Sequence, residues 1–204
     1  MAFGTRVDTI PAARAYFPPI AAEERRAWEA RLGDHHQMRI GLVWSGNQRH
    51  VNDHNRSVPL NVMARLVTAE AQFVSLQKDP RPSDGAVLRE RPDIADYTCH
   101  MTDFSATAAL ISCLDLVITV DTSVAHLAAA FGRPTWILLP YTPDYRWLLD
   151  RDDSPWYPTV RLFRQDETRS YETVIDRVKA EVAKQIYSFA DTVGKRQEAP
   201  FEPG

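Results

Sequence analysis

The sequence predicts an α/β domain with a mostly parallel sheet, and the stretch Leu114–Pro140 carries most of this prediction. An apolar, β-branched run over 116–120 is followed by small residues in a helical pattern that ends at Gly132, and a second apolar run covers 135–139. Strand, tight turn, helix and strand in this order form the βαβ unit of a parallel sheet. Strands and helices alternate through the rest of the chain, which is typical of the α/β class.

Short apolar runs predict four further strands, which cover residues 38–44, 72–76, 94–98 and 160–163. One-sided apolar patterns predict four further helices, over 23–32, from Pro59 to about Glu70, from Thr102 to Leu114 and from Tyr171 to about Ala190. The polar stretch 48–57 and the Pro- and Arg-rich stretch after Lys78 are expected to be loops.

This pattern divides the 204 residues into three parts. Residues 1–37 hold one short helix and no run of strand quality, so we expect a linker that wraps or leads into a domain. Residues 38–191 form the domain itself, and the Pro-containing stretch 192–204 is expected to be a flexible tail.

Composition excludes several classes of protein. A net charge of −3 and a pI near 6.1 give no global attraction to nucleic acid or to an anionic membrane. Cys99 and Cys113 are too few for a disulfide scaffold, and no apolar run approaches the roughly 20 residues that span a bilayer. The N-terminus has no apolar core of a signal peptide. We therefore expect a cytoplasmic protein without a membrane span or nucleic-acid partner.

The turn after the central strand is a candidate anion site. Asp121, Thr122 and Ser123 all favour the N-cap position, so the following helix should begin at the carboxyl end of the strand. Helix N-termini at that edge of a parallel sheet suit phosphate groups. His126 lies on the first turns of this helix, and two interpretations stay open: a packed helical histidine, or a side chain that touches the ligand.

Other motifs narrow the chemistry. The chain contains neither G-x-G-x-x-G nor a P-loop, which argues against an NAD oxidoreductase or an ATPase. His35 and His36 are adjacent and cannot face one point, and no D-x-D pair follows a strand, so no metal site is expected. Ser45-Gly46-Asn47 directly follows an apolar strand and would let backbone approach a ligand closely.

Several stretches together carry a resemblance. DTSVAHLAAAFGRPTWILLP, beginning at Asp121, resembles the D-[ST]-x-x-x-H-x-A-A-A-x-G-x-P motif of heptosyltransferase-type glycosyltransferases. A narrower group of proteins contains similar stretches in the same order and with similar gaps: IGLVWSGN, NRSVPL, FVSLQK and SPWYPTVRLFRQ. With these stretches the similarity covers residues 38–165. In that group of bacterial proteins, tetratricopeptide repeats precede a GT-B glycosyltransferase region that is distantly similar to O-GlcNAc transferase.

The resemblance implies a Rossmann-like, three-layer domain that forms the C-terminal, donor-binding half of a GT-B fold. It would bind a nucleotide-diphosphate sugar as the donor substrate, without a cofactor or a metal. Position by position, the resemblance implies the following donor-binding residues: Ser45, Gly46 and Asn47 in the first phosphate-side loop, Arg56 on the diphosphate, Gln77 and Lys78 beside the nucleoside, and Asp121, Thr122, Ser123 and His126 on the diphosphate and sugar.

The same resemblance leaves the catalytic base outside this chain, because in heptosyltransferases it comes from the N-terminal, acceptor-binding half. A complete enzyme would transfer a hexosyl or heptosyl group to a protein or glycan acceptor. This chain would need its missing half, another chain or self-association to do so. The alternatives are a non-catalytic nucleotide-binding or interaction module and, with less support, a GT-B-like epimerase. The aromatic loop 141–157 would either stack on sugar or pack on the linker helix.

Overall fold

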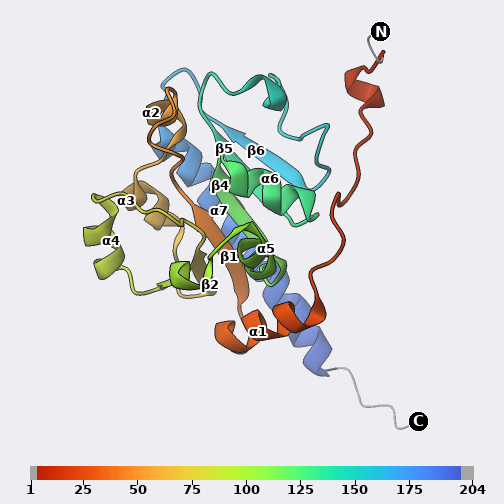
Figure 1. The fold of residues 1–204 in the computed structure, drawn as a ribbon. Helices are drawn as coiled ribbons and strands as arrows, with labels where there is room; N and C mark the ends of the chain where they lie inside the picture. Colours follow the sequence, from red (N-terminus) through yellow and green to blue (C-terminus); the bar gives the residue numbers. More distant parts are fainter. Residues whose placement is uncertain (1–3, 199–204) are drawn as a thin grey trace.

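The computed structural model describes residues 4–198. Six strands within this range form a single sheet (Figure 1). Every neighbouring pair of strands is parallel, in the order β3-β2-β1-β4-β5-β6. The strands are β1 (Met38–Val43), β2 (Ala71–Ser75), β3 (Ile94–Asp96), β4 (Leu116–Val120), β5 (Thr135–Leu139) and β6 (Val160–Arg164). The predicted α/β, Rossmann-like class is confirmed.

This strand order reverses between β1 and β4. From β1 the chain proceeds outward through β2 to β3, and it then returns to β4 and proceeds through β5 to β6 on the other side. The loops that follow β1 and β4 therefore leave the sheet in opposite directions. Ligands of open α/β sheets bind in the crevice that this divergence creates at the carboxyl edge.

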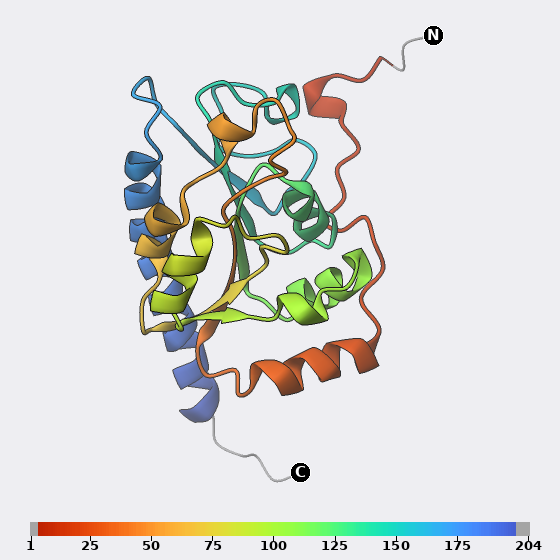
Figure 2. The same ribbon diagram turned by 60° about the vertical axis from the view of Figure 1, so that its left-hand side comes forward.

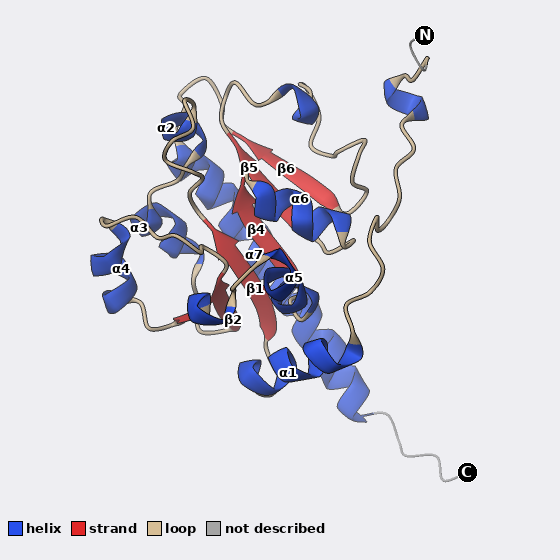
Figure 3. Ribbon diagram, in the orientation of Figure 1, coloured by secondary structure: helices blue, strands red, loops and turns tan. Residues whose placement is uncertain are grey.

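Helices cover both faces of the sheet, which makes three layers (Figures 2 and 3). One face carries α3 (Leu60–Met63), α4 (Asp84–Glu90) and the long α7 (Tyr171–Glu198). The other carries α1 (Ala22–Leu32), α5 (Phe104–Ser112) and α6 (Ser123–Ala130). All residues of β1, β4 and β5 are buried. Because these strands are buried on both faces of the sheet, their sequences are nearly continuous apolar runs.

Several predicted boundaries are wrong. The helix expected from Pro59 to Glu70 is only α3 and a 3-10 turn over Ala64–Leu66, because the chain becomes extended at Val67. The strand expected over 94–98 ends at Asp96, and a 3-10 turn follows it. The two stretches expected to be loops each contain a helix, namely α2 (Asp53–Arg56) and α4.

The last helix also extends beyond its predicted end near Ala190. It continues through Glu198 and includes the ion pair between Asp191 and Lys195, four residues apart on one face. The tail predicted over 192–204 therefore begins too early, and its residues 199–204 lie outside the described part of the chain.

The linker packs along the domain on the side of α6 (Figure 1). The amide of Tyr16 donates to the carbonyl of Ala130 at 2.7 Å, and the Phe17 ring lies 5.1 Å from that of Phe131. Further along, Trp28 and Leu32 of α1 are buried against α5. The segment thus lies along the domain from α6 to α5.

Replacing Gly132 with alanine should destabilise the protein by about 1–3 kcal/mol, since Gly132 has a φ of 69° and an added Cβ would collide with the carbonyl oxygen of Arg14. Urea unfolding measures the change. Gly194→Ala is the matched control, because Gly194 lies in α7 with nothing within 4 Å of an added Cβ. That control should be neutral or slightly stabilising. Equal destabilisation of both variants would contradict the argument.

Candidate functional site

A cavity of about 730 Å³ lies at the switch point, between the loops after β1, β2 and β4. Seven of the residues singled out from the sequence line it: Ser45, Gly46, Asn47, Gln77, Lys78, Thr122 and Ser123. Asp121 and Arg56 lie immediately behind this lining, joined by a hydrogen bond from the Arg56 guanidinium to the Asp121 carbonyl. His126 lines a neighbouring cavity that shares Ser123 with this one, and its Nε2 lies 3.9 Å from the Asp121 carboxylate. The structure therefore places nine of the ten residues in or directly behind the lining of this cavity, and His126 beside Asp121.

The N-terminus of α6 forms one wall of this cavity. Thr122 is the N-cap residue, but its side chain makes no capping hydrogen bond, and its hydroxyl lies 3.3 Å from that of Thr119 instead. The first amides of a helix have no acceptor within the helix. Ser123 and Val124, which carry these amides, both line the cavity. An anion placed there would accept from them and interact favourably with the helix dipole.

The loop after β1 forms the opposite wall and is held by buried side chains. The Gln77 side-chain oxygen accepts hydrogen bonds from the amides of Trp44 at 3.2 Å and Ser45 at 3.0 Å. The amide of Gly46 donates to the Ser57 hydroxyl at 3.1 Å. Gln77 thus shapes the cavity by fixing the loop, and the amides of Ser45 and Gly46 are already satisfied within the protein.

Arg56 bridges the two walls. Its Nη1 donates to the carbonyl of Asp121 at 3.1 Å, and its guanidinium lies directly over Gly46, where an added Cβ would be 2.5 Å from Nη2. The Arg56 Nε is buried and has no hydrogen-bond partner among the described residues. This cation therefore lies between the loop after β1 and the end of β4, close to the N-terminus of α6.

Two residues that no sequence motif indicates support this arrangement, namely Arg81 and Asp84. The Asp84 carboxylate accepts from the Trp44 indole at 2.9 Å and from the Arg81 amide at 2.8 Å. Both Arg81 and Asp84 belong to the stretch expected to be a loop, and they carry no motif. Asp84 is connected with the site through Trp44, the residue after β1, and Arg81 through its contacts with Asp53 and Ser57.

Lys78 lies at the rim of the cavity. Its side chain is exposed, and its ammonium donates to the carbonyl of Thr102 at 2.8 Å, next to the N-cap residue Asp103 of α5. This contact places a positive charge at the outer end of the cavity, away from Arg56 and on the side toward α5.

A second cavity of about 820 Å³ shares Phe104 and Ser123 with the first. Apart from these two its lining is mainly aromatic: Tyr16, Phe17, His126, Leu127, Ala130, Tyr145, Arg146, Trp147, Trp156 and Tyr157. The His126 ring stacks on Trp147 at 5.2 Å, and its Nδ1 lies 3.2 Å from the Tyr157 hydroxyl. His126 is therefore a packed helical histidine whose side chain also borders a cavity, and contact with a ligand stays a prediction.

The aromatic loop packs mainly within the domain. Trp147 is fully buried, and the linker residue Tyr16 packs edge-on against Tyr157 and donates its hydroxyl proton to the Trp156 carbonyl at 2.6 Å. The partner of the loop is therefore the extended part of the linker rather than the helix at 22–32. Tyr145, which is 81% exposed, is available to a ligand.

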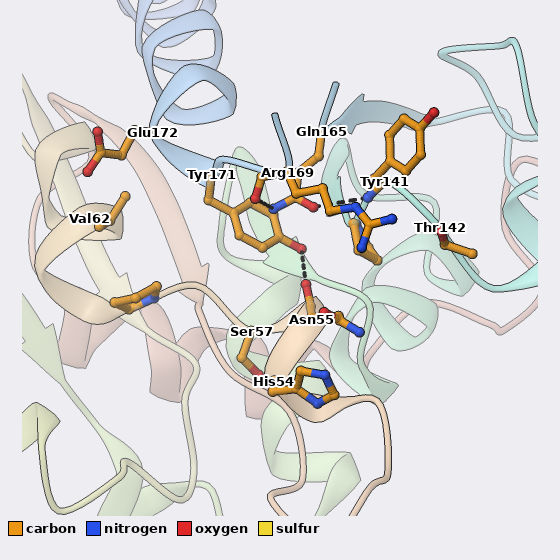
Figure 4. Close-up of a pocket in the computed structure, with 12 residues that line it drawn as sticks. His54, Asn55, Ser57, Val62, Tyr141, Thr142, Gln165, Arg169, Tyr171 and Glu172 are labelled. Carbon is orange, nitrogen blue, oxygen red and sulfur yellow. Dashed lines mark hydrogen bonds between the residues drawn. The ribbon is translucent and has the colours of Figure 1, made fainter. Parts of the chain in front are cut away.

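A third cavity, of about 350 Å³, lies at the same edge of the sheet beside the N-terminus of α7 (Figure 4). The Tyr171 hydroxyl donates to the carbonyl of Asn55 at 3.1 Å and thereby joins α7 to α2. Arg169 lies over the Tyr141 ring, 5.5 Å from its centre. None of the residues selected from the sequence lines this cavity.

The described part of the chain contains no group of three or more His, Cys, Asp or Glu side chains arranged to hold a metal ion. Within the same residues, no helix combines the length and the apolar character needed to cross a bilayer.

Comparison with known proteins shows a similarity to glycosyltransferases over part of the chain. The model of glycosyltransferase family 9 (heptosyltransferase) matches residues 93–182, which include the Asp121–His126 turn. E. coli ADP-heptose LPS heptosyltransferase II superimposes on 83% of this chain with a TM-score of 0.56 at 17% identity. The fold is one that heptosyltransferases share. A family 9 glycosyltransferase from Veillonella parvula gives a TM-score of 0.52 at 12% identity over 84% of the chain.

The chain is shorter than these relatives. It covers 53% of the E. coli structure and 52% of the Veillonella structure, so it spans about half of each. Protein FlbA of Caulobacter vibrioides is 26% identical over 177 residues, which amount to 84% of this chain and 29% of FlbA.

His126 should make the stability of the protein depend on pH. Burial, and secondly the nearby Arg146, lower the pKa of His126 below its usual value of 6.5, against an opposing effect of Asp121. Between the lowered pKa and about 6.5, the unfolded chain binds a proton that the folded protein does not. Stability should therefore fall as the pH decreases through that window.

Urea unfolding from pH 7.5 to 5 tests this expectation. His126→Gln should lose less stability on acidification than the wild-type protein, and His36→Gln, at an exposed position in the linker, is the control for removal of an imidazole. An identical loss in wild type and His126→Gln would contradict the proposed effect.

Proposed function

We propose that this chain is the donor-binding half of a GT-B glycosyltransferase and that the switch-point cavity binds a nucleotide-diphosphate sugar. One observation carries the proposal: the uncapped N-terminus of α6 lines the cavity at the carboxyl edge of β1 and β4, and the Arg56 guanidinium lies directly behind that lining, against Gly46 and the Asp121 carbonyl. The match of residues 93–182 to the heptosyltransferase family supports it. The diphosphate would lie between Arg56 and the amides of Ser123 and Val124.

This arrangement suits the chemistry of glycosyl transfer. As the bond between the sugar and the diphosphate breaks, negative charge develops on the leaving diphosphate. A preorganised cation and the positive end of a helix stabilise such charge most where little water can screen it. The Arg56 side chain is mostly buried, with 16% of its surface exposed. We therefore propose metal-independent transfer, in which Arg56 and α6 supply the positive charge.

Lys78, at the outer end of the cavity, would border the nucleoside, as the resemblance implies. Asp121 and His126 would face the sugar: their side chains lie 3.9 Å apart, and His126 lines the second cavity, which shares Ser123 with the first. A carboxylate and an imidazole both form hydrogen bonds with sugar hydroxyls.

The acceptor half would come from elsewhere. This chain covers only about half of the solved relatives, and we propose that an acceptor-binding half carries the catalytic base, in the same polypeptide or in another chain. We also propose that the acceptor is a protein or a glycan, that the chain is associated with tetratricopeptide repeats, and that the protein is cytoplasmic. Without that half, the chain should bind the donor and not transfer the sugar.

Calorimetry with UDP, GDP, ADP, CMP and their common sugar conjugates tests the donor site. Arg56→Ala should weaken binding of the preferred nucleoside diphosphate by about 1.5–3 kcal/mol, because it removes a charge-assisted contact. Thr122→Ala should also weaken it and leave the fold intact. Arg151→Ala is the control, since Arg151 pairs with Asp153 outside all three cavities. Unchanged affinity in Arg56→Ala would contradict the phosphate site.

Gly46→Ala separates binding from folding. The three atoms nearest to an added Cβ all belong to the Arg56 guanidinium, at the end of a long side chain, so the guanidinium should be displaced while the backbone stays in place. We expect donor affinity to fall on the order of tenfold, which corresponds to about 1.4 kcal/mol. The unfolding midpoint in urea should change little. A variant with wild-type affinity would show that the position of Arg56 over Gly46 does not matter for binding.

A further inference from the structure

A buried carboxylate lies beside Arg56 at the base of the switch-point site. Asp53, in α2, is buried, with 9% of its side chain exposed. Its Oδ1 lies 3.7 Å from the Nε of Arg56, and its Oδ2 pairs with the Nη2 of Arg81 in a direct ion pair. Two guanidinium groups therefore face a single carboxylate.

The contacts show which arginine Asp53 neutralises. Arg81 makes a hydrogen-bonded ion pair with Asp53 and donates a further hydrogen bond to the Ser57 hydroxyl at 2.9 Å. The Ser57 hydroxyl donates in turn to Asp53 at 2.8 Å. Arg56, in contrast, makes no hydrogen bond to Asp53, and its Nη1 donates to the Asp121 carbonyl instead. The negative charge of Asp53 is thus taken up by Arg81.

We propose that Arg81 is a positioning residue that keeps Arg56 electrostatically available to the donor diphosphate. The inference rests on the proposed function and deepens it. With Arg81 present, the three charged side chains carry a net charge of about +1, and Arg56 contacts Gly46 of the cavity lining. Without Arg81, Asp53 would be a buried carboxylate lacking its partner, and Arg56 would be the only cation among the described residues within 4 Å of it. The cost of an unpaired buried charge would draw Arg56 toward Asp53 and away from Gly46.

The same group of residues also holds the loop. Ser57 accepts from the amide of Gly46 at 3.1 Å, so the Asp53–Arg81 pair and the loop after β1 share one hydrogen-bond network. A purely structural role for Arg81 would act through these hydrogen bonds, whereas the proposed role acts through charge. Amide replacements separate the two, because glutamine and asparagine keep hydrogen-bonding capacity and remove charge.

The test compares wild type, Arg81→Gln, Asp53→Asn and the double variant, with inorganic pyrophosphate as the probe. Calorimetry at several salt concentrations reports both affinity and its electrostatic part. Arg81→Gln should weaken pyrophosphate binding on the order of tenfold or more and make it less sensitive to salt. Asp53→Asn should bind at least as well as wild type. The double variant should recover affinity to within a fewfold of wild type.

Arg91→Gln is the matched control, because it removes an arginine from another Arg–Asp pair, with Asp93, remote from the cavity lining. It should leave pyrophosphate affinity and its salt dependence unchanged. Urea unfolding of every variant establishes that the affinities refer to folded protein.

Two results would overturn the inference. One is that Arg81→Gln binds pyrophosphate with wild-type affinity. The other is that the double variant binds pyrophosphate no better than Arg81→Gln, since a structural role of Arg81 would then explain the loss of affinity. Either result would leave the proposed function intact if wild type binds pyrophosphate and Arg56→Ala does not. Failure of wild type to bind pyrophosphate or any nucleoside diphosphate would overturn the proposed function and this inference together.

Discussion

The candidate site depends on the contact of Arg56 with both sides of the switch point. Its guanidinium lies on Gly46, in the loop after β1, and donates to the carbonyl of Asp121, at the end of β4. These two segments diverge because the strand order reverses between β1 and β4. Only glycine leaves room for the guanidinium at position 46. The topology therefore creates the cavity, and a single cation joins its walls and gives it the sign of charge that a diphosphate requires.

Around this contact, polar side chains keep the cavity open rather than fill it. Gln77 and Ser57 hold the amides of the loop after β1, and Asp84 fixes the Trp44 indole beneath it. The N-terminus of α6, in contrast, has no capping side chain. This difference between the two walls is consistent with a preorganised binding site: the amides of one wall already have hydrogen-bond partners, and those of the other can donate to a ligand.

The parts of the fold that were predicted well are those with a strong periodic signal. The central βαβ unit was located from its apolar runs and its N-cap residues, and the structure places β4, α6 and β5 within it. Helix α4 was missed because seven residues with little amphipathic pattern follow a Pro- and Arg-rich stretch. The contact between Arg81 and Asp53 could not be predicted from the sequence either, because tertiary packing alone brings together these residues, which are 28 positions apart. The alternatives for His126 could not be resolved, since its ring both packs on Trp147 and borders a cavity.

The most direct test of the account is to locate the diphosphate on the protein by amide NMR. Titration of ¹⁵N-labelled protein with ADP and with UDP should shift the amide signals of Asn47, Ser123 and Val124 most strongly, since these residues line the switch-point cavity. Signals of Tyr141 and Glu172, which line the cavity beside α7, should change little. Shifts confined to Tyr141 and Glu172, or no saturable shift with either nucleotide, would contradict the claim that the switch point binds the donor.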